Sequence, residues 1–165
     1  SLGVMGVGLP YSIGVQFANP NSLVIDIDGD GSFNHTLSEL KTIVDYNLPI
    51  KIAVMNDGHM SMVRVWEDLF FDKRYTATNC NNNPQYHKLA ESYGIKGIVC
   101  DNKKDLEEKI DHFLNYKGPI LCNFKVETDK CLPLVAPGKS LDEMILPVSQ
   151  TKKNDNILDT SLPPS

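Results

Sequence analysis

The sequence has 165 residues, 41% of them hydrophobic and 22% charged, which is the composition of one ordinary globular domain with a substantial core. Its net charge of −5, without any cluster of lysines and arginines, argues against nucleic acid as a partner. No apolar run is long enough to span a membrane, and the four cysteines form no C-x-x-C pair, which favours reduced thiols and a cytoplasmic location.

The chain begins with a glycine-rich segment, residues 2–10, and a short helix is expected over residues 11–17. Pro10 suits the first turn of that helix, where its missing N–H group costs nothing. Glycines this dense either let the backbone approach a ligand closely or form a tight connection beneath a sheet. The sequence starts without methionine and inside this motif, which indicates a fragment of a longer chain.

Residues 23–27 are rich in β-branched side chains and predict a buried strand that runs directly into the turn Gly29-Asp30-Gly31. A helical spacing of apolar residues follows over residues 37–44. A strand, a glycine turn and a helix in succession offer free backbone N–H groups to a phosphate. Because Asp30 adds a carboxylate to that turn, the pattern favours a divalent metal such as Mg²⁺ between carboxylate and phosphate.

A second strand is predicted over residues 50–55, and it ends at Asn56 and Asp57. In open parallel sheets, ligands bind at the carboxyl ends of the strands. Asp30 follows one such end, and Asn56 and Asp57 lie at the other. The sequence therefore predicts a metal site at this edge, with Asp30 as one ligand and the side-chain oxygens of Asn56 and Asp57 completing the shell.

Three other readings compete at this turn. Asp26, Asp28 and Asp30 open an EF-hand calcium loop, but its twelfth position is Leu37 rather than glutamate, and a strand precedes it. The early glycines suggest a dinucleotide-binding loop, with Asp26 and Asp28 as ribose ligands, but they do not fall as G-x-G-x-x-G. The third reading is an acidic turn at a strand end that binds nothing.

The segment after Asp57 predicts a helix over residues 62–71. Its apolar stripe of Met62, Val63 and Trp66 fits either a core face or the wall of a pocket. Residues 76–84 are polar and rich in asparagine, which predicts a surface loop.

The rest of the chain alternates between helices and strands. Helices are expected over residues 85–93 and 101–115, and strands over residues 95–100 and 120–126. This alternation predicts an α/β fold, a doubly wound and mostly parallel sheet with helices on both faces, over residues 1–126. An irregular arm over residues 127–150 and a disordered tail over residues 151–165 are expected to follow.

Several motifs resemble the carboxy-terminal domain of the acetohydroxyacid synthase (acetolactate synthase) catalytic subunit. They are residues 3–10 (GVMGVGLP), 28–33 (DGDGSF), 62–66 (MVRVW), 70–75 (FFDKRY) and 133–145 (PLVAPGKSLDEMI). The spacing of 27 positions between Asp30 and Asp57 is typical of the thiamine-diphosphate-binding motif, which specifies only a larger superfamily. The Trp66 helix and the arm after Pro133 narrow the resemblance from this superfamily to the acetohydroxyacid synthase family. The resemblance covers residues 1–147.

The resemblance implies the thiamine-diphosphate-binding fold and a particular metal site. Mg²⁺ is implied to be held by the side chains of Asp30 and Asp57 and by the backbone carbonyl of His59. The chain departs from the family at Asp57, where asparagine is usual, and this adds a negative charge beside the diphosphate. It also departs at Met60 and Ser61, where the family usually has a polar residue followed by glycine.

The resemblance also implies residues for the organic cofactor and the substrates. Those implied to hold thiamine diphosphate are Gly3, Met5, Gly29, Gly31 and Ser32. Among them, the carbonyl of Gly3 is implied to bind the aminopyrimidine, and Met5 to be the apolar wedge that bends the cofactor. Those implied to line the substrate channel are Met62, Val63 and Trp66.

The implied activity is the condensation of two pyruvates, or of pyruvate and 2-ketobutyrate, with loss of CO2, in the biosynthesis of branched-chain amino acids such as isoleucine and valine. The resemblance implies a homodimer or higher oligomer with the active site at the subunit interface. A regulatory subunit is a further partner that the family allows. A eukaryotic source would place the protein in a mitochondrion or plastid. The activating glutamate and the FAD site of the family lie in domains outside this sequence, so the isolated chain is expected to be inactive. The open alternatives are another thiamine-diphosphate-dependent 2-keto acid decarboxylase or carboligase, and a non-catalytic remnant of the fold.

Overall fold

The computed structural model describes residues 3–147, and the chain divides into two units, Ser1–Lys130 and Cys131–Ser165. The expected disordered tail, residues 151–165, lies outside the described residues. Within the described part, no helix is both long enough and apolar enough to cross a membrane.

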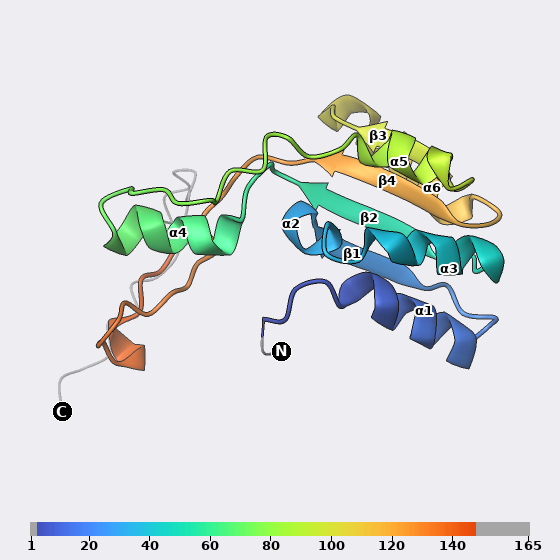
Figure 1. Ribbon diagram of the computed structural model, residues 1–165. Coiled ribbons are helices and arrows are strands. Elements are labelled where there is room, and N and C mark those ends of the chain that lie inside the picture. Colours follow the sequence, from blue (N-terminus) through green and yellow to red (C-terminus); the bar gives the residue numbers. More distant parts are fainter. Residues whose placement is uncertain (1–2, 148–165) are drawn as a thin grey trace, which may run out of the picture. The chain divides into compact units, whose positions relative to one another are not determined.

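The first unit is built on one parallel sheet of four strands (Figure 1). The strands are β1 (Ile25–Gly29), β2 (Lys51–Asn56), β3 (Lys96–Cys100) and β4 (Ile120–Lys125). Their spatial order is β1-β2-β4-β3, so β2 and β4 are central and β1 and β3 are the edges. All three pairings are parallel, as the alternation of strands and helices in the sequence predicts.

Helices cover both faces of this sheet, which confirms the doubly wound α/β prediction. The helices are α1 (Gly8–Ala18), α2 (Asp30–Phe33), α3 (Leu40–Asp45), α4 (Ser61–Phe70), α5 (Tyr86–Ser92) and α6 (Leu106–Asn115), with 3₁₀ turns η1 (Leu37–Glu39) and η2 (Lys103–Asp105). Side chains of α1, α2, α3 and α5 form the larger core on one face, together with inward residues of β2 and β4. Phe113 of α6 packs on the other face against Ala53, Ile120 and Cys122.

The prediction of a buried first strand is wrong for half of its side chains. Ile25 and Ile27 of β1 are exposed, Ile27 by 72%, whereas Asp26 and Asp28 are buried. The reason is that β1 is an edge strand whose one face lies against α1, where Gly8 approaches both carboxylates. Burial, with the charge of Asp28 as a second cause, raises the pKa of Asp26 to about 7.

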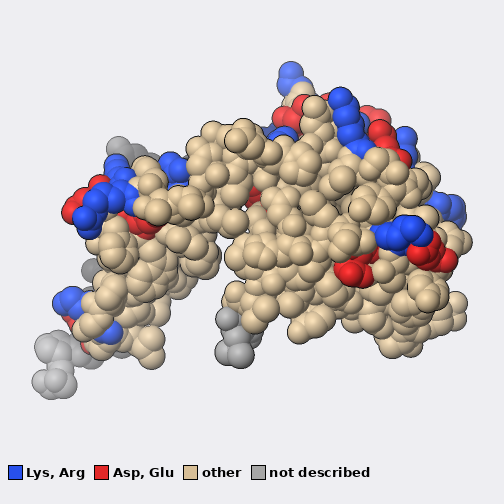
Figure 2. Space-filling model, viewed as in Figure 1, with Lys and Arg blue, Asp and Glu red and all other residues tan. Residues whose placement is uncertain are grey.

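The N-terminal helix α1 contains no charged residue, and its outer surface is correspondingly free of Lys, Arg, Asp and Glu in Figure 2. Leu9 and Ile13 point inward to the larger core, while Tyr11 and Val15 are exposed. Two apolar side chains one turn apart therefore fix this helix on the sheet.

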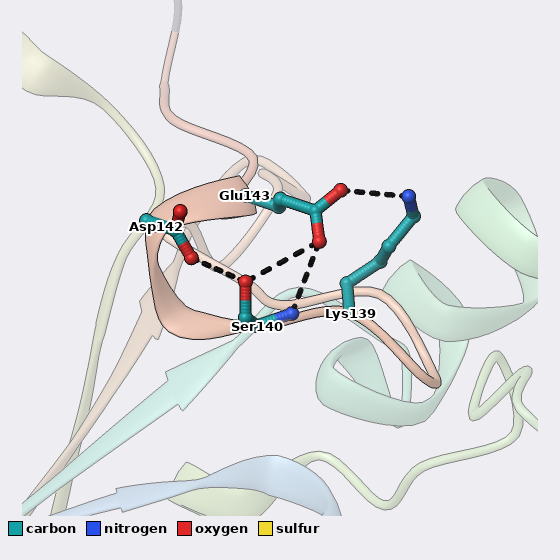
Figure 3. Close-up of polar contacts among 4 residues, drawn as sticks. All are labelled: Lys139, Ser140, Asp142 and Glu143. Carbon is teal, nitrogen blue, oxygen red and sulfur yellow. Dashed lines mark hydrogen bonds and ion pairs between the residues drawn. The ribbon is translucent and has the colours of Figure 1, made fainter.

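The second unit contains an irregular segment between residues 131 and 147. Leu134 and Ile145 pair as an antiparallel bridge with N···O distances of 3.0 and 2.7 Å. Between them, a short 3₁₀ turn, η3 (Leu141–Glu143), begins with a capping box of Ser140 and Glu143 (Figure 3). Lys139 donates to Glu143 at 2.7 Å, so local polar contacts rather than a sheet organise this segment.

Candidate cofactor site

The Gly-Asp-Gly turn joins the end of β1 to α2 and presents Asp30 at the carboxyl edge of the sheet. Asp30 is only 2% exposed, and its Oδ2 accepts a hydrogen bond from Asn83 Nδ2. Burial is the main cause that raises the pKa of Asp30, and the negative charge of Asp57 is the second. Two carboxylates that repel each other across a strand end are a suitable binding site for a divalent cation.

The second half of the site is the turn that follows β2. Asp57 Oδ1 accepts from the backbone N–H of His59 at 3.0 Å, and Asp57 Oδ2 accepts from the Ser61 hydroxyl. The His59 ring Nδ1 lies 2.9 Å from the Asp57 carbonyl and 3.0 Å from Thr128 Oγ1. Hydrogen bonds from three sides therefore hold this turn in one conformation.

Buried amides anchor the same turn to the sheet. Asn56, the last residue of β2, donates from Nδ2 to Asn123 Oδ1 of β4 at 3.1 Å, and both side chains are buried. An amide pair between adjacent strands fixes where β2 ends and so where Asp57 begins its turn.

The glycine-rich N-terminal loop lies against the Gly-Asp-Gly turn. The N–H of Gly6, which has a φ of 77°, donates to Ser32 Oγ at 2.9 Å. A Cβ built on Gly31 would lie 3.5 Å from Met5 Cε and 2.5 Å from Met60 Sδ. The structure thus brings Met5, Gly31 and Ser32 together, as the resemblance implies, and adds Met60.

The other two expected cofactor residues are Gly29 and Gly3. Gly29 is the N-cap of α2, and no other atom lies within 4 Å of a Cβ built there. Gly3 is exposed and has a φ of 67°, which glycine adopts without strain.

The donor atoms fit a hard cation. No group of three His, Cys, Asp or Glu side chains suited to a metal occurs among residues 3–147. The implied site does not require one, since two carboxylates and a backbone carbonyl leave the remaining positions to diphosphate oxygens and water, which is the usual shell of Mg²⁺. The residues present therefore fit Mg²⁺ bound together with a diphosphate.

The asparagine-rich segment 76–84 is an irregular and largely exposed loop, as expected, but part of it contacts the site. Thr78 is buried, and Asn83 donates to Asp30 while its own Oδ1 accepts from Asn34 Nδ2 at 2.8 Å. Tyr86 donates to Asn34 Oδ1 at 3.0 Å, which closes a network behind Asp30. Sequence reasoning missed these contacts because no local pattern links residues about fifty positions apart.

A polar cavity of about 280 Å³ opens beside Asp57. The residues around it include Asn56, Asp57, Cys80, Asn83 and Lys125. Burial, followed by the charges of Asp30 and Asp57, raises the pKa of the Cys80 thiol. This thiol therefore ionises less readily than that of an ordinary cysteine.

The apolar stripe of α4 lines a second cavity, of about 460 Å³. Val63 and Trp66 contribute to it together with Glu67, Phe71, Arg74 and Thr76. Met62 is not among these residues, and both Met62 and Val63 are 52% exposed, so neither belongs to the core. The sequence predicts this stripe to be either a core face or the wall of a pocket, and Val63 and Trp66 lie in the wall of a pocket.

Residues 1–124 match the sequence model of the family described as "Thiamine pyrophosphate enzyme, C-terminal TPP binding domain". The chain belongs to this family. Thiamine pyrophosphate is another name for thiamine diphosphate, and the site at the ends of β1 and β2 lies within the matched residues of this TPP-binding domain.

Curated relatives of this TPP-binding domain are acetolactate synthases. The chain is 45% identical to "Acetolactate synthase large subunit" of Cyanidium caldarium, over 94% of this chain and 27% of that protein. It is 48% identical to "Acetolactate synthase catalytic subunit, mitochondrial" of Saccharomyces cerevisiae, over 87% of this chain and 21% of that protein. The chain thus spans about a quarter of the length of these relatives.

A solved structure shares the fold of the TPP-binding domain. It is the Rhodococcus jostii RHA1 thiamine diphosphate-dependent 4-hydroxybenzoylformate decarboxylase, with a TM-score of 0.70 and 26% identity. The match covers 76% of this chain and 24% of that chain. The fold expected from the resemblance is therefore confirmed.

Proposed function

We propose that this domain is the cofactor-binding, C-terminal part of an acetolactate synthase that condenses two pyruvates, or pyruvate and 2-ketobutyrate, with loss of CO2. The observation that carries the proposal is that two carboxylates, Asp30 and Asp57, follow the ends of adjacent parallel strands and lie close enough to repel each other. The similarity of 45 to 48% to acetolactate synthases supports the choice of reaction.

In this proposal, Asp30, Asp57 and the carbonyl of His59 hold Mg²⁺, and Ser32 with the amides of Gly29 and Gly31 faces the diphosphate. When bound, thiamine diphosphate would supply the carbon nucleophile that adds to the keto carbon of a 2-keto acid, and it would take up the electron pair left when CO2 departs. The residues of this chain bind and orient the cofactor. The two carboxylates hold the cation, and the hydrogen bond from Asn83 opposes rotation of the Asp30 side chain.

The substrate side of the proposed site is formed by α4. Val63 and Trp66 line the apolar cavity and would admit a short alkyl chain, while Met62 is exposed at the same helix. Gly3 and Met5, in the N-terminal loop, are proposed to contact the aminopyrimidine and to bend the cofactor. We also propose that the enzyme is a homodimer or higher oligomer with this site at the subunit interface. FAD is proposed to bind in a domain outside this sequence, and a regulatory subunit is a further partner that the family allows.

The proposed location is cytoplasmic or, by analogy with two yeast relatives whose names include "mitochondrial", the mitochondrion. The second candidate function is a thiamine-diphosphate-dependent decarboxylase, which the structural neighbour from Rhodococcus favours. The two functions differ in product, since incubation of the complete enzyme with pyruvate gives acetolactate in one case and acetaldehyde in the other.

Asp30→Asn should weaken the binding of thiamine diphosphate with Mg²⁺ more than about a hundredfold, because even partners outside the metal's own ligands are worth about 10- to 100-fold. Isothermal titration of the complete enzyme measures this affinity and does not need turnover. Asp101→Asn is the matched control, since Asp101 is exposed and lies outside the site. If the parent protein gives no binding heat with both ligands, the domain is a remnant of the fold and the proposed function is wrong.

Asp57→Asn should bind the same cofactor complex about threefold to tenfold more tightly than the parent protein. The variant has one negative charge fewer beside the diphosphate, and a charge pair at the edge of a protein is worth on the order of 1 kcal/mol. Competitive titration of both proteins in one buffer measures the ratio. Equal or tighter binding by the parent protein would contradict this prediction and show that the Asp57 carboxylate does not weaken cofactor binding.

A further inference from the structure

Both oxygens of the Asp57 carboxylate are engaged by residues of its own turn. The backbone N–H of His59 reaches Oδ1 at 3.0 Å, and the hydroxyl of Ser61 reaches Oδ2. A carboxylate has no hydrogen to give, so Ser61 is the donor in this second bond. The remaining lone pairs of each oxygen stay available for a cation.

Ser61 reaches Asp57 because of its place in the fold. It is the first residue of α4 and follows Asp57 by four positions, across the turn that His59 braces. The N-cap residue Met60 makes no side-chain cap bond. The Ser61 hydroxyl is therefore directed at the carboxylate and not used to cap its helix.

The bond from Ser61 acts against the charge repulsion at this edge of the sheet. Asp57 and Asp30 follow the ends of adjacent parallel strands, and their two negative charges repel each other. Rotation of the Asp57 side chain away from Asp30 would relieve this repulsion. A bond from Ser61 to one oxygen opposes that rotation while the His59 N–H holds the other.

We propose that Ser61 is a positioning residue of the cation site, which keeps the Asp57 carboxylate turned toward the ion that it shares with Asp30. This inference rests on the proposed function, in which that ion accompanies thiamine diphosphate. Ser61 itself does not touch the ion. The Ser61 hydroxyl and the Asp57 carboxylate bind each other directly.

The test is a titration of the complete enzyme with Mn²⁺ at a fixed concentration of thiamine diphosphate, followed by the electron paramagnetic resonance signal of free Mn²⁺. Ser61→Ala should weaken Mn²⁺ binding about tenfold or more, the usual effect of losing a bond to a metal-binding carboxylate. Ser61→Thr keeps the hydroxyl and should stay within about threefold of the parent protein. Ser92→Ala, which removes a hydroxyl bonded to Leu89 O in α5, is the matched control and should leave Mn²⁺ binding unchanged.

Each other outcome decides between the two proposals. If Ser61→Ala binds Mn²⁺ as the parent does while Asp57→Ala does not, the role of Ser61 is refuted and the metal site stands. If Ser61→Thr is as weak as Ser61→Ala, the effect does not come from the hydroxyl, and the inference is also refuted. If the parent protein retains no Mn²⁺ with thiamine diphosphate, the proposed function fails as well.

Discussion

Replacing Asp26 by asparagine should stabilise the protein at pH 8 by up to about 4 kcal/mol and leave its stability at pH 4 nearly unchanged. Asp26 is buried on β1, and neither its Oδ2 nor that of Asp28 has a hydrogen-bond partner among the described residues. Its pKa is about 7 in the folded protein, against 3.8 for an ordinary aspartate. Between about pH 4 and pH 7, the folded protein therefore binds one proton more at Asp26 than the unfolded chain does.

The sign of the effect follows from that proton. As the pH rises from about 4 to about 7, the free energy of unfolding falls, because the carboxyl ionises readily only in the unfolded chain. Above pH 7 the loss is complete. Asparagine does not titrate, resembles the neutral acid in shape and offers Asp28 a donor, so Asp26→Asn removes this loss.

Urea unfolding of the parent protein and Asp26→Asn at pH 4, 6 and 8 measures the difference, which should grow with pH. Taking the difference cancels the titration of all other groups. Asp101→Asn, at an exposed site, should show no such growth. A difference that is constant with pH would mean that Asp26 ionises normally in the folded protein.

Gly97→Ala should destabilise the protein by more than about 3 kcal/mol and should leave little folded protein at 37 °C. Gly97 is a buried residue of edge strand β3, and α5 crosses it so closely that a Cβ would overlap the carbonyl oxygen of His87. The same Cβ would lie 2.7 Å from the carbonyl carbon of His87. Because the obstacle is backbone, α5 as a whole would have to move.

Gly14→Ala is the matched control for this steric argument. The chemical change is the same, but no atom lies within 4 Å of a Cβ at Gly14, which is in the interior of α1. Alanine is the better helix former, so Gly14→Ala should stabilise by about 0.5–1 kcal/mol. Thermal unfolding of both variants measures the two effects, and equal melting temperatures would contradict the close packing of α5 on β3.

Much of the fold can be predicted from the sequence because its signals are local. Short segments rich in apolar residues specify the strands, and Gly94, with a φ of 86°, follows the end of α5 as predicted. When strands alternate with helices, each helix crosses from one strand to the next over a face of the sheet, and the strands are therefore parallel. The same locality explains why Asp30 and Asp57 are predictable as neighbours, since each directly follows a strand.

Other parts of the candidate site depend on contacts that no local signal encodes. Asn83 lies 53 positions after Asp30, in a segment whose composition predicts only a surface loop. Val63 and Trp66 have the spacing of a core helix, yet they line a cavity with Arg74 and Thr76. In both cases the neighbours come from the return path of the chain, which periodicity does not describe.

The sequence by itself determined the order of strands and helices, the α/β class and the two strand ends that carry Asp30 and Asp57, because hydrophobic period and turn chemistry act within a few residues. Only the tertiary structure decided that Asp26 and Asp28 are buried while Ile25 and Ile27 are exposed. The physical reason is that alternation along a strand defines two faces but does not say which one a helix covers. That choice was made by the position of β1 at the sheet edge and by the approach of α1 through Gly8.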